Sequence, residues 1–124
     1  MLKTASGSVE DLEVFKRAYA LSLDIHRASL SLPVVEQYGL APQMRRASKS
    51  ICVNLAEGFA KWQASPAEFG RYVMIALGSA DEMQIWCRYC VDLGYVSAEV
   101  VDAWRARYAE IAKMLQGLRK HLQL

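Results

Sequence analysis

Apolar residues recur every three or four positions in four separate stretches of the chain, which is the spacing of one face of an α-helix. The first stretch follows Ser8, a residue that caps helices well, and Glu10 and Asp11 place negative charge in its first turn. Pro33 marks its end. The pattern predicts a first helix over residues 8–32. Its apolar face comprises Leu12, Phe15, Tyr19, Leu23, His26 and Leu30.

A second helix follows a break that contains Gly39 and Pro42. Proline fits the first position of a helix because its missing amide hydrogen would have no helical partner there. The spacing therefore predicts a helix over residues 42–61. Its apolar face comprises Met44, Ser48, Ile51, Cys52, Leu55 and Phe59.

The start of the third helix carries the clearest local signal. Ser65 can cap the helix, Pro66 suits its first position, and the Glu68 carboxylate can bond back to the cap, as in a capping box. Gly94 is well placed as the C-terminal stop, so the helix is predicted over residues 66–93. Its apolar side comprises Phe69, Tyr72, Val73, Ala76, Ala80, Met83, Cys87 and Cys90.

Ser97 caps a fourth helix, predicted over residues 98–122, with Glu99 in its first turn. Its apolar seam comprises Val101, Trp104, Tyr108, Ile111, Leu115, Leu118 and Leu122. This unbroken alternation of three and four indicates near-parallel helix packing at about 20°. With no strand-rich segment, the sequence predicts an all-α, antiparallel up-down four-helix bundle. One domain, residues 8–124, follows a flexible tail of residues 1–7.

Three of the predicted helices carry more apolar residues than one buried face requires. The third has Met74, Ile85 and Tyr89 on its reverse side, together with the small Gly70 and Gly78. Small residues allow another surface to approach closely, so the surplus predicts a second buried face in a homo-oligomer. Scattered surface apolar residues are the simpler alternative. The second and fourth helices contribute Val53, Ala56, Ala60, Ala103, Ala106 and Ala109 to this surplus.

A polar stripe runs along the second helix, roughly opposite its apolar face, and polar or small residues line up on the third. The second-helix stripe comprises Arg46, Ser50, Asn54, Glu57 and Lys61. The stripe is either a solvated face or a hydrogen-bonded seam between helices or between subunits. We expect the oligomer interface to comprise Asn54, Glu57, Met74, Gly78, Glu82, Ile85 and Tyr89.

A chain of 124 residues has the size of one domain, and a composition of 53% hydrophobic and 23% charged residues excludes intrinsic disorder. Three cysteines are an odd number, which favours a reducing cytoplasm over a disulfide framework. The N-terminus lacks the apolar core of a signal peptide, and the longest apolar stretch, residues 73–80, is too short for a membrane span. We therefore expect a cytoplasmic protein without membrane contact.

Candidate catalytic and metal-binding residues are few. Cys87 and Cys90 form a C-x-x-C pair, but inside a helix and on its apolar side, where core packing is the favoured interpretation. Adding Cys52 and His26 would complete a zinc set only if three helices converged. No Glu-x-x-His pair, phosphate-binding glycine loop or nucleophile elbow occurs. We expect no enzyme activity, cofactor, metal or small-molecule ligand.

Basic residues are unevenly distributed along the chain. Residues 45–61 hold four cationic side chains against one acidic side chain, although the whole chain carries a net charge of only +2. A cationic surface of this kind attracts nucleic acid, whereas the alternative is a charged face that only keeps a helix soluble. The candidate nucleic-acid-binding residues are Arg45, Arg46, Lys49, Arg119 and Lys120.

Residues 43–58 (QMRRASKSICVNLAEG) resemble the signature of a bacterial four-helix-bundle family. Its members include proteins encoded within intervening sequences of large-subunit ribosomal RNA genes. The pattern continues in order through residues 65–69, residues 76–79 with Glu82, and residues 93–95, and the resemblance spans residues 12–122. One departure is Cys52-Val53, where the family usually has a small residue and proline. The matching signature positions are Arg46, Ser50, Asn54, Glu57, Gly58, Gly78, Ser79 and Glu82.

The resemblance implies a four-helix bundle that assembles into a ring-like homopentamer. It also implies a relationship to the accessory proteins of diversity-generating retroelements, which work beside a reverse transcriptase and bind nucleic acid. The family pattern assigns no catalytic role to the signature residues. Two function classes remain: a non-enzymatic module that binds RNA, DNA or a protein partner, and an enzyme or metal protein with a site at the intersubunit polar seam.

Overall fold

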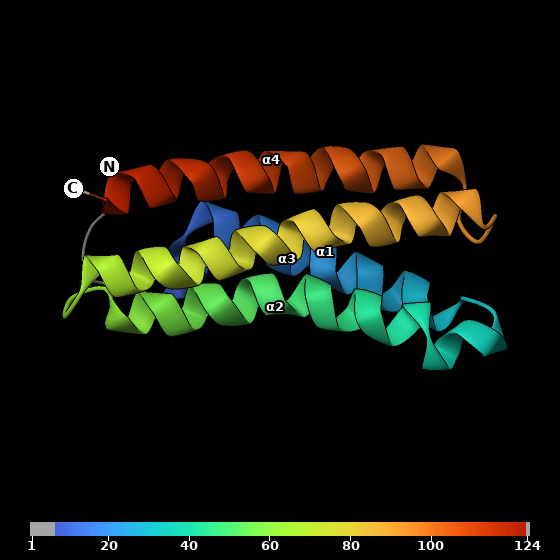
Figure 1. The fold of residues 1–124 in the computed structure, drawn as a ribbon, viewed down its shortest axis with the longest axis horizontal. Coiled ribbons are helices and arrows are strands. Elements are labelled where there is room, and N and C mark those ends of the chain that lie inside the picture. Colours follow the sequence, from blue (N-terminus) through green and yellow to red (C-terminus); the bar gives the residue numbers. More distant parts are fainter. Residues whose placement is uncertain (1–6, 124) are drawn as a thin grey trace.

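The computed structural model describes residues 7–123 as four helices without a strand, which confirms the predicted all-α bundle (Figure 1). Two short 3₁₀ turns precede the first and second helices. The elements are η1 (Val9–Asp11), α1 (Glu13–Leu30), η2 (Val34–Tyr38), α2 (Leu40–Lys61), α3 (Pro66–Asp92) and α4 (Ala98–Leu122).

Successive helices run in opposite directions and are joined by short connections, as in an up-down bundle. In Figure 1, α2 and α3 lie side by side in front, α4 lies along the top, and α1 lies behind. The closest packing is between α2 and α3, followed by α3 with α4 and α1 with α2. The beginning of α1, the end of α2, the beginning of α3 and the end of α4 therefore share one end of the bundle.

The helix α1 begins at Glu13, five residues later than predicted. Ser8 and Asp11 form a capping box, in which Ser8 Oγ accepts from the Glu10 amide at 3.1 Å and Asp11 Oδ2 accepts from the Ser8 amide at 2.9 Å. This box closes the 3₁₀ turn η1 rather than the α-helix. Leu12 then has extended backbone, and α1 begins at Glu13. Of the predicted tail, residues 1–7, only Gly7 lies within the described residues.

A carboxylate from η2 caps the beginning of α2, two residues before the predicted start. Glu36 Oε1 accepts a hydrogen bond from the Leu40 amide at 3.0 Å, and Tyr95 Oη donates to Glu36 Oε2 at 2.8 Å. The pair therefore also ties the α3–α4 connection to η2. Pro42 consequently lies in the first turn of α2, where its missing amide hydrogen breaks no helical bond.

The ends of α3 follow the predicted signals with one exception. Ser65 Oγ accepts from the Glu68 amide at 3.1 Å, but the Glu68 carboxylate bonds Arg71 instead of the cap. Gly94 stops the helix with φ of 76°, and the Tyr95 amide donates to the Cys90 carbonyl at 2.9 Å.

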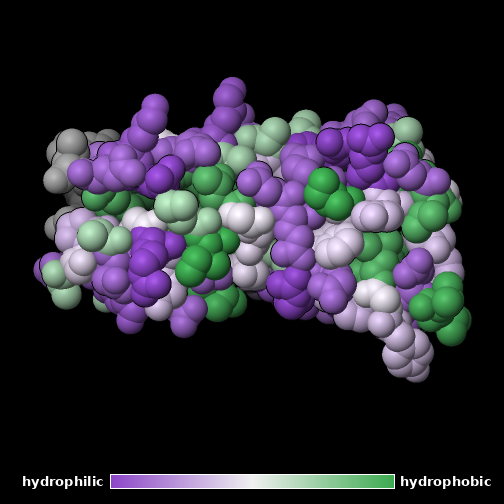
Figure 2. Space-filling view, viewed as in Figure 1, coloured by the Kyte–Doolittle hydropathy of each residue, from purple (hydrophilic) through white to green (hydrophobic). Residues whose placement is uncertain are grey.

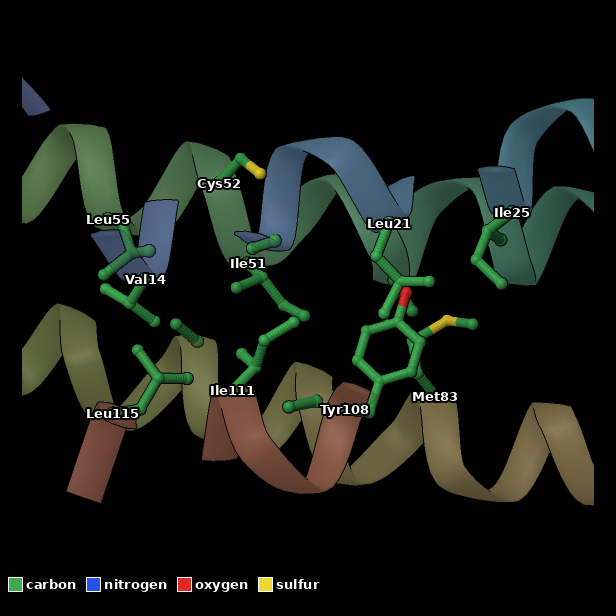
Figure 3. Close-up of a cluster of buried hydrophobic side chains, with 14 of the residues drawn as sticks. Val14, Leu21, Ile25, Ile51, Cys52, Leu55, Met83, Tyr108, Ile111 and Leu115 are labelled. Carbon is green, nitrogen blue, oxygen red and sulfur yellow. The ribbon is translucent and has the colours of Figure 1, made fainter. Parts of the chain in front are cut away.

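The buried core follows the predicted faces of α2, α3 and α4, with Phe59 and Tyr72 at its half-buried edge. Side chains from all four helices interdigitate in its centre (Figure 3). All seven predicted seam residues of α4 are buried. Gly58 allows α2 to approach α3 closely, because a Cβ there would lie 2.6 Å from the Phe69 ring and 2.8 Å from Tyr72 Cβ.

The predicted apolar face of the first helix is wrong over most of its length: Leu12 and Phe15 pack half-buried against the core, but the later apolar members are exposed. Tyr19 is 52% exposed and Leu30 is 59% exposed, whereas small and medium side chains face the core. The buried serines among them satisfy their hydroxyls locally, as Ser22 Oγ donates to the Tyr19 carbonyl at 2.7 Å. The bundle thus buries the slimmer face of α1 and leaves the bulky one outside. The buried residues of α1 are Val14, Ala18, Leu21, Ser22, Ile25 and Ser29.

Among the described residues, no helix combines the length and apolarity needed to cross a bilayer.

Candidate functional site

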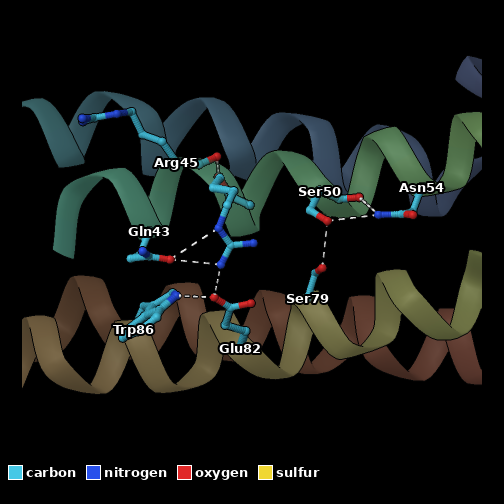
Figure 4. Close-up of polar contacts among 9 residues, drawn as sticks. Gln43, Arg45, Ser50, Asn54, Ser79, Glu82 and Trp86 are labelled. Carbon is cyan, nitrogen blue, oxygen red and sulfur yellow. Dashed lines mark hydrogen bonds and ion pairs between the residues drawn. The ribbon is translucent and has the colours of Figure 1, made fainter. Parts of the chain in front are cut away.

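A polar seam joins α2 to α3 within a single chain (Figure 4). Arg46 forms an ion pair with Glu82, and the Trp86 indole N–H donates to Glu82 Oε2 at 2.9 Å. Gln43 Oε1 accepts from Arg46 Nη2 at 3.1 Å, which orients the guanidinium toward α3. The charges of Arg46 and Glu82 therefore neutralise each other across the two helices.

The seam continues through the small polar residues of the signature. Ser79 Oγ donates to Ser50 Oγ at 3.0 Å. Asn54 Nδ2 donates to the Ser50 carbonyl at 2.8 Å and lies 3.0 Å from Ser50 Oγ. Of the two interpretations of the polar stripe, the structure supports a hydrogen-bonded seam between helices of one chain for Arg46 and Ser50, whereas Asn54 bonds to Ser50 within α2.

The outer side of α3 keeps the surplus apolar residues exposed. Met74 and Tyr89 are each 49% exposed, and Ile85 is 55% exposed. Gly78 lies among them with no atom within 4 Å of where a Cβ would stand. Across the seam, the α2 residue Val53 is 55% exposed. Apolar side chains accordingly interrupt the polar surface on this face of the molecule (Figure 2).

The predicted interface residues therefore divide into two groups. Glu82 accepts from Arg46 across the seam and from Trp86, and Asn54 donates to Ser50 on its own helix. The other five are exposed on α2 or on the outer side of α3, where a second copy can reach them. These are Glu57, Met74, Gly78, Ile85 and Tyr89. That they form an oligomer interface stays a prediction.

The five basic candidates do not form one surface. Arg46 belongs to the α2–α3 seam, while Arg45 points away from it (Figure 4). Arg119 borders a hollow with Ser65 and Arg71 at the end of the bundle where α3 begins. Lys120 is exposed near the same end of α4.

Arg45 and Lys49 lie together on the opposite side of α2, facing α1. Arg45 Nη1 donates to Ser29 Oγ at 2.7 Å, and Lys49 Nζ lies 2.9 Å from His26 Nδ1. Arg27 follows His26 on α1, and its positive charge also acts on the imidazole. We call Arg27, Arg45 and Lys49, together with His26, the basic cluster.

Little negative charge opposes the basic cluster. Among residues 7–123, neither Arg45 nor Lys49 forms an ion pair with a carboxylate. Arg27 Nη1 lies 3.8 Å from Asp24, but Arg107 of α4 binds the same carboxylate more closely, at 2.8 Å. The nearby cations lower the pKa of His26 below its ordinary value. Lys49 has the largest effect, and burial, Arg45 and Arg27 add to it.

The sequence did not identify His26 and Arg27 as members of this cluster. The spacing of apolar residues places His26 on an apolar face of the first helix, and only the packing of α1 against α2 brings Lys49 to it. The one usable signal was the four-residue spacing of Arg45 and Lys49, which places both on one side of a helix.

The three cysteines are free and buried in the core. Burial raises the pKa of the Cys52 thiol to about 11 and that of the Cys87 thiol to about 12, so both stay protonated at neutral pH. His26 lies outside the core beside Lys49, so the zinc set considered from the sequence is not assembled. Across residues 7–123, no three His, Cys, Asp or Glu side chains come together as metal ligands.

Comparison with known proteins gives a family and a fold. A family model described as 23S rRNA-intervening sequence protein matches residues 10–117. A crystal structure of a protein of unknown function, from the S23 ribosomal protein family of Bacteroides thetaiotaomicron, superposes with a TM-score of 0.74. The two sequences are 22% identical, and the match covers 86% of this chain and 95% of that one. No curated protein sequence matches the chain.

Proposed function

This chain belongs to the 23S rRNA-intervening sequence protein family, and we propose that it is a non-enzymatic, homo-oligomeric module that binds RNA or DNA through the basic cluster. The observation that carries the proposal is the chemistry of that cluster. Arg45 and Lys49 can only donate hydrogen bonds, and neither forms an ion pair with a carboxylate of the described chain. A phosphate offers only acceptors and negative charge, so it complements this set.

Contacts of this kind recognise the nucleic-acid backbone and carry no base information. Binding through the basic cluster should therefore tolerate many sequences and weaken steeply with salt, because each phosphate contact releases counterions. Arg119 and Lys120, at one end of the bundle, extend the cationic surface only if the nucleic acid follows the long axis of the molecule.

The exposed apolar side of α3 supports the oligomeric part of the proposal. Met74, Ile85 and Tyr89 are large side chains, each about half exposed in the single chain, and a second copy would bury them. The family resemblance favours a ring-like pentamer, with a summed charge of about +10 from subunits of +2. Several weak phosphate contacts on one ring would then add up to useful affinity.

Such a module suits an accessory role beside an enzyme that works on nucleic acid, such as a reverse transcriptase. A reducing cytoplasm suits its three free thiols. The competing class, an enzyme or metal protein using the polar seam, is less well supported, because Arg46 and Glu82 already neutralise each other there. Stoichiometric zinc or iron in the purified protein would reverse this preference.

The direct test is a titration of a fluorescent RNA hairpin, read by anisotropy at low and at moderate salt. We expect wild-type binding at low salt and at least about tenfold weaker binding of the double variant Arg45→Ala/Lys49→Ala. The matched control, Arg17→Ala/Arg71→Ala, removes the same charge from arginines that pair with carboxylates on their own helices, and should bind as wild type does.

Two results would contradict the proposal. If wild type does not bind even at low salt, a scaffold for protein partners is the better interpretation of the bundle. If both double variants weaken binding equally, only the total charge matters, and the basic cluster is not the site.

A further inference from the structure

The hydrogen bond between Lys49 and His26 determines the state of the imidazole. Lys49 Nζ lies 2.9 Å from His26 Nδ1, and an ammonium group can donate but cannot accept. His26 Nδ1 must therefore be the acceptor, which leaves the ring neutral with its proton on Nε2. In this state the basic cluster presents hydrogen-bond donors from Arg45, Lys49 and the His26 Nε2–H, a set that matches the acceptors of a phosphate.

Every charged group that faces His26 favours the neutral ring. Lys49 and Arg45 act on it from α2, and Arg27 acts from α1; together with partial burial they lower the pKa of His26. The nearest carboxylate on α1, Asp24, is bound by Arg107 at 2.8 Å and by Arg27 at 3.8 Å. In the free protein, neither Lys49 nor Arg45 forms an ion pair within residues 7–123, and Arg27 shares the Asp24 carboxylate with Arg107.

We propose that His26 takes up a proton when a backbone phosphate binds at the basic cluster, so that the protein binds nucleic acid more tightly as the pH falls. This inference rests on the proposed function and adds a proton-linked ligand, His26, to the same site. No covalent step is involved. The only transfer is one proton from solvent to His26 Nδ1.

The linkage follows from what the phosphate displaces. Its oxygens compete with His26 Nδ1 for the Lys49 ammonium, which frees the ring nitrogen to accept a proton. Its negative charge also offsets Lys49, Arg45 and Arg27, whose repulsion disfavoured the imidazolium in the free protein. The imidazolium then adds one more charge-assisted hydrogen bond to the phosphate. Since the bound form holds one more proton than the free form, lower pH favours binding.

The experiment uses the full-length protein and a fluorescent oligo-dT strand, because neither its phosphodiesters nor its bases titrate between about pH 5.5 and about pH 8, the range in which histidine changes charge. Anisotropy titrations at constant salt give Kd across this range. We expect wild-type Kd to fall with decreasing pH, with a steepest slope approaching about tenfold per pH unit for one proton.

The decisive variant is His26→Gln, whose side-chain oxygen can still accept from Lys49 but cannot be protonated. We expect its Kd to be nearly constant with pH. The matched control is His121→Gln, which removes the other histidine, on α4 at the far end of the bundle from the cluster, and should keep the wild-type pH dependence. Circular dichroism of both variants checks that the helices are retained.

A second readout separates this inference from the proposed function. In NMR pH titrations, the His26 ring signal should titrate at a higher pH with oligo-dT than without it. If the protein binds but the His26 midpoint does not move, or if wild type and His26→Gln share one pH dependence, the proton linkage is wrong while nucleic-acid binding stands. If the protein does not bind at any pH in low salt, the proposed function and this inference both fail.

Discussion

Tyr108 offers a sharp test of the core, because its hydroxyl is buried without a partner. The side chain is 0% exposed, and within residues 7–123 its oxygen is the buried side-chain polar atom left without a hydrogen bond. Figure 3 shows the hydroxyl directed into the core toward α1, among apolar side chains. Burial holds the pKa of Tyr108 far above its ordinary value, because the phenolate would lose its hydration in the core.

The expected effect of Tyr108→Phe follows from this geometry. An unsatisfied buried hydroxyl costs about 1–3 kcal/mol, and the substitution removes that oxygen while keeping the ring that fills the core. The missing oxygen leaves a small gap, and the atoms around this gap lose some dispersion contacts, which reduces the gain in stability. We therefore expect Tyr108→Phe to raise the free energy of unfolding by about 1 kcal/mol, and Tm by about 4 °C.

Urea denaturation followed by circular dichroism measures this difference, with both proteins at equal concentration because oligomers gain stability with concentration. The matched control is Tyr95→Phe, which removes a hydroxyl that donates to Glu36 Oε2 at 2.8 Å and should lower stability. If Tyr108→Phe destabilises the protein as much as Tyr95→Phe does, the Tyr108 hydroxyl has a partner such as buried water, and the apolar description of this core is wrong.

Three further predictions concern assembly, acid stability and thiol chemistry. Met74→Asp should dissociate the proposed oligomer in multi-angle light scattering while retaining the helical signal, because it places a charge on the outer apolar side of α3; an unchanged mass would exclude this surface as the interface. Hydrogen bonds from the Leu40 amide and the Tyr95 hydroxyl lower the pKa of Glu36 in the folded protein. Ionised Glu36 therefore stabilises the fold at pH values above its pKa in the unfolded chain. This stabilisation is lost as the pH falls through the lower pKa of the folded protein. Acid denaturation of Glu36→Gln should therefore depend less on pH than that of wild type, and equal dependence would count against the cap. With the Cys87 pKa at about 12, native protein should react with a thiol reagent at least about a hundredfold more slowly than unfolded protein, and rapid native labelling would contradict burial of the thiol.

Three of the four helix faces could be predicted from the sequence because on each of them one stripe holds most of the large apolar side chains. On α4, the alternating seam from Val101 to Leu122 has no apolar rival of comparable size, and all of it is buried. On α2 the cap came instead from Glu36, whose partners Leu40 and Tyr95 are brought together by the fold, so the start was misplaced by two residues.

The face of α1 could not be chosen from its pattern alone. Two stripes compete there, and residue size favoured the one that contains Tyr19 and Leu30. The bundle buries the other, with Ala18 and Ser22, since small residues let α1 approach its neighbours and the serine hydroxyl bonds the Tyr19 carbonyl of its own helix. The size of the side chains on a stripe does not show which stripe lets the helix pack closely against its neighbours.

The candidate site was partly predictable for the same kind of reason. Residues on one helix, such as Arg45 and Lys49, can be placed on a shared side from their spacing. Spacing does not predict contacts between helices. The Arg46–Glu82 ion pair and the Lys49–His26 hydrogen bond are therefore seen only in the structure.

The salt dependence of binding shows whether Arg45 and Lys49 contact nucleic-acid phosphates. The measurement is the slope of log Kobs against log salt concentration for wild type, Arg45→Ala/Lys49→Ala and the control Arg17→Ala/Arg71→Ala, all with one RNA hairpin. Each lost phosphate contact makes the slope shallower by about one. We therefore expect a slope shallower by about 2 for the Arg45/Lys49 variant and a wild-type slope for the control. Equal slopes for wild type and the Arg45/Lys49 variant would contradict it.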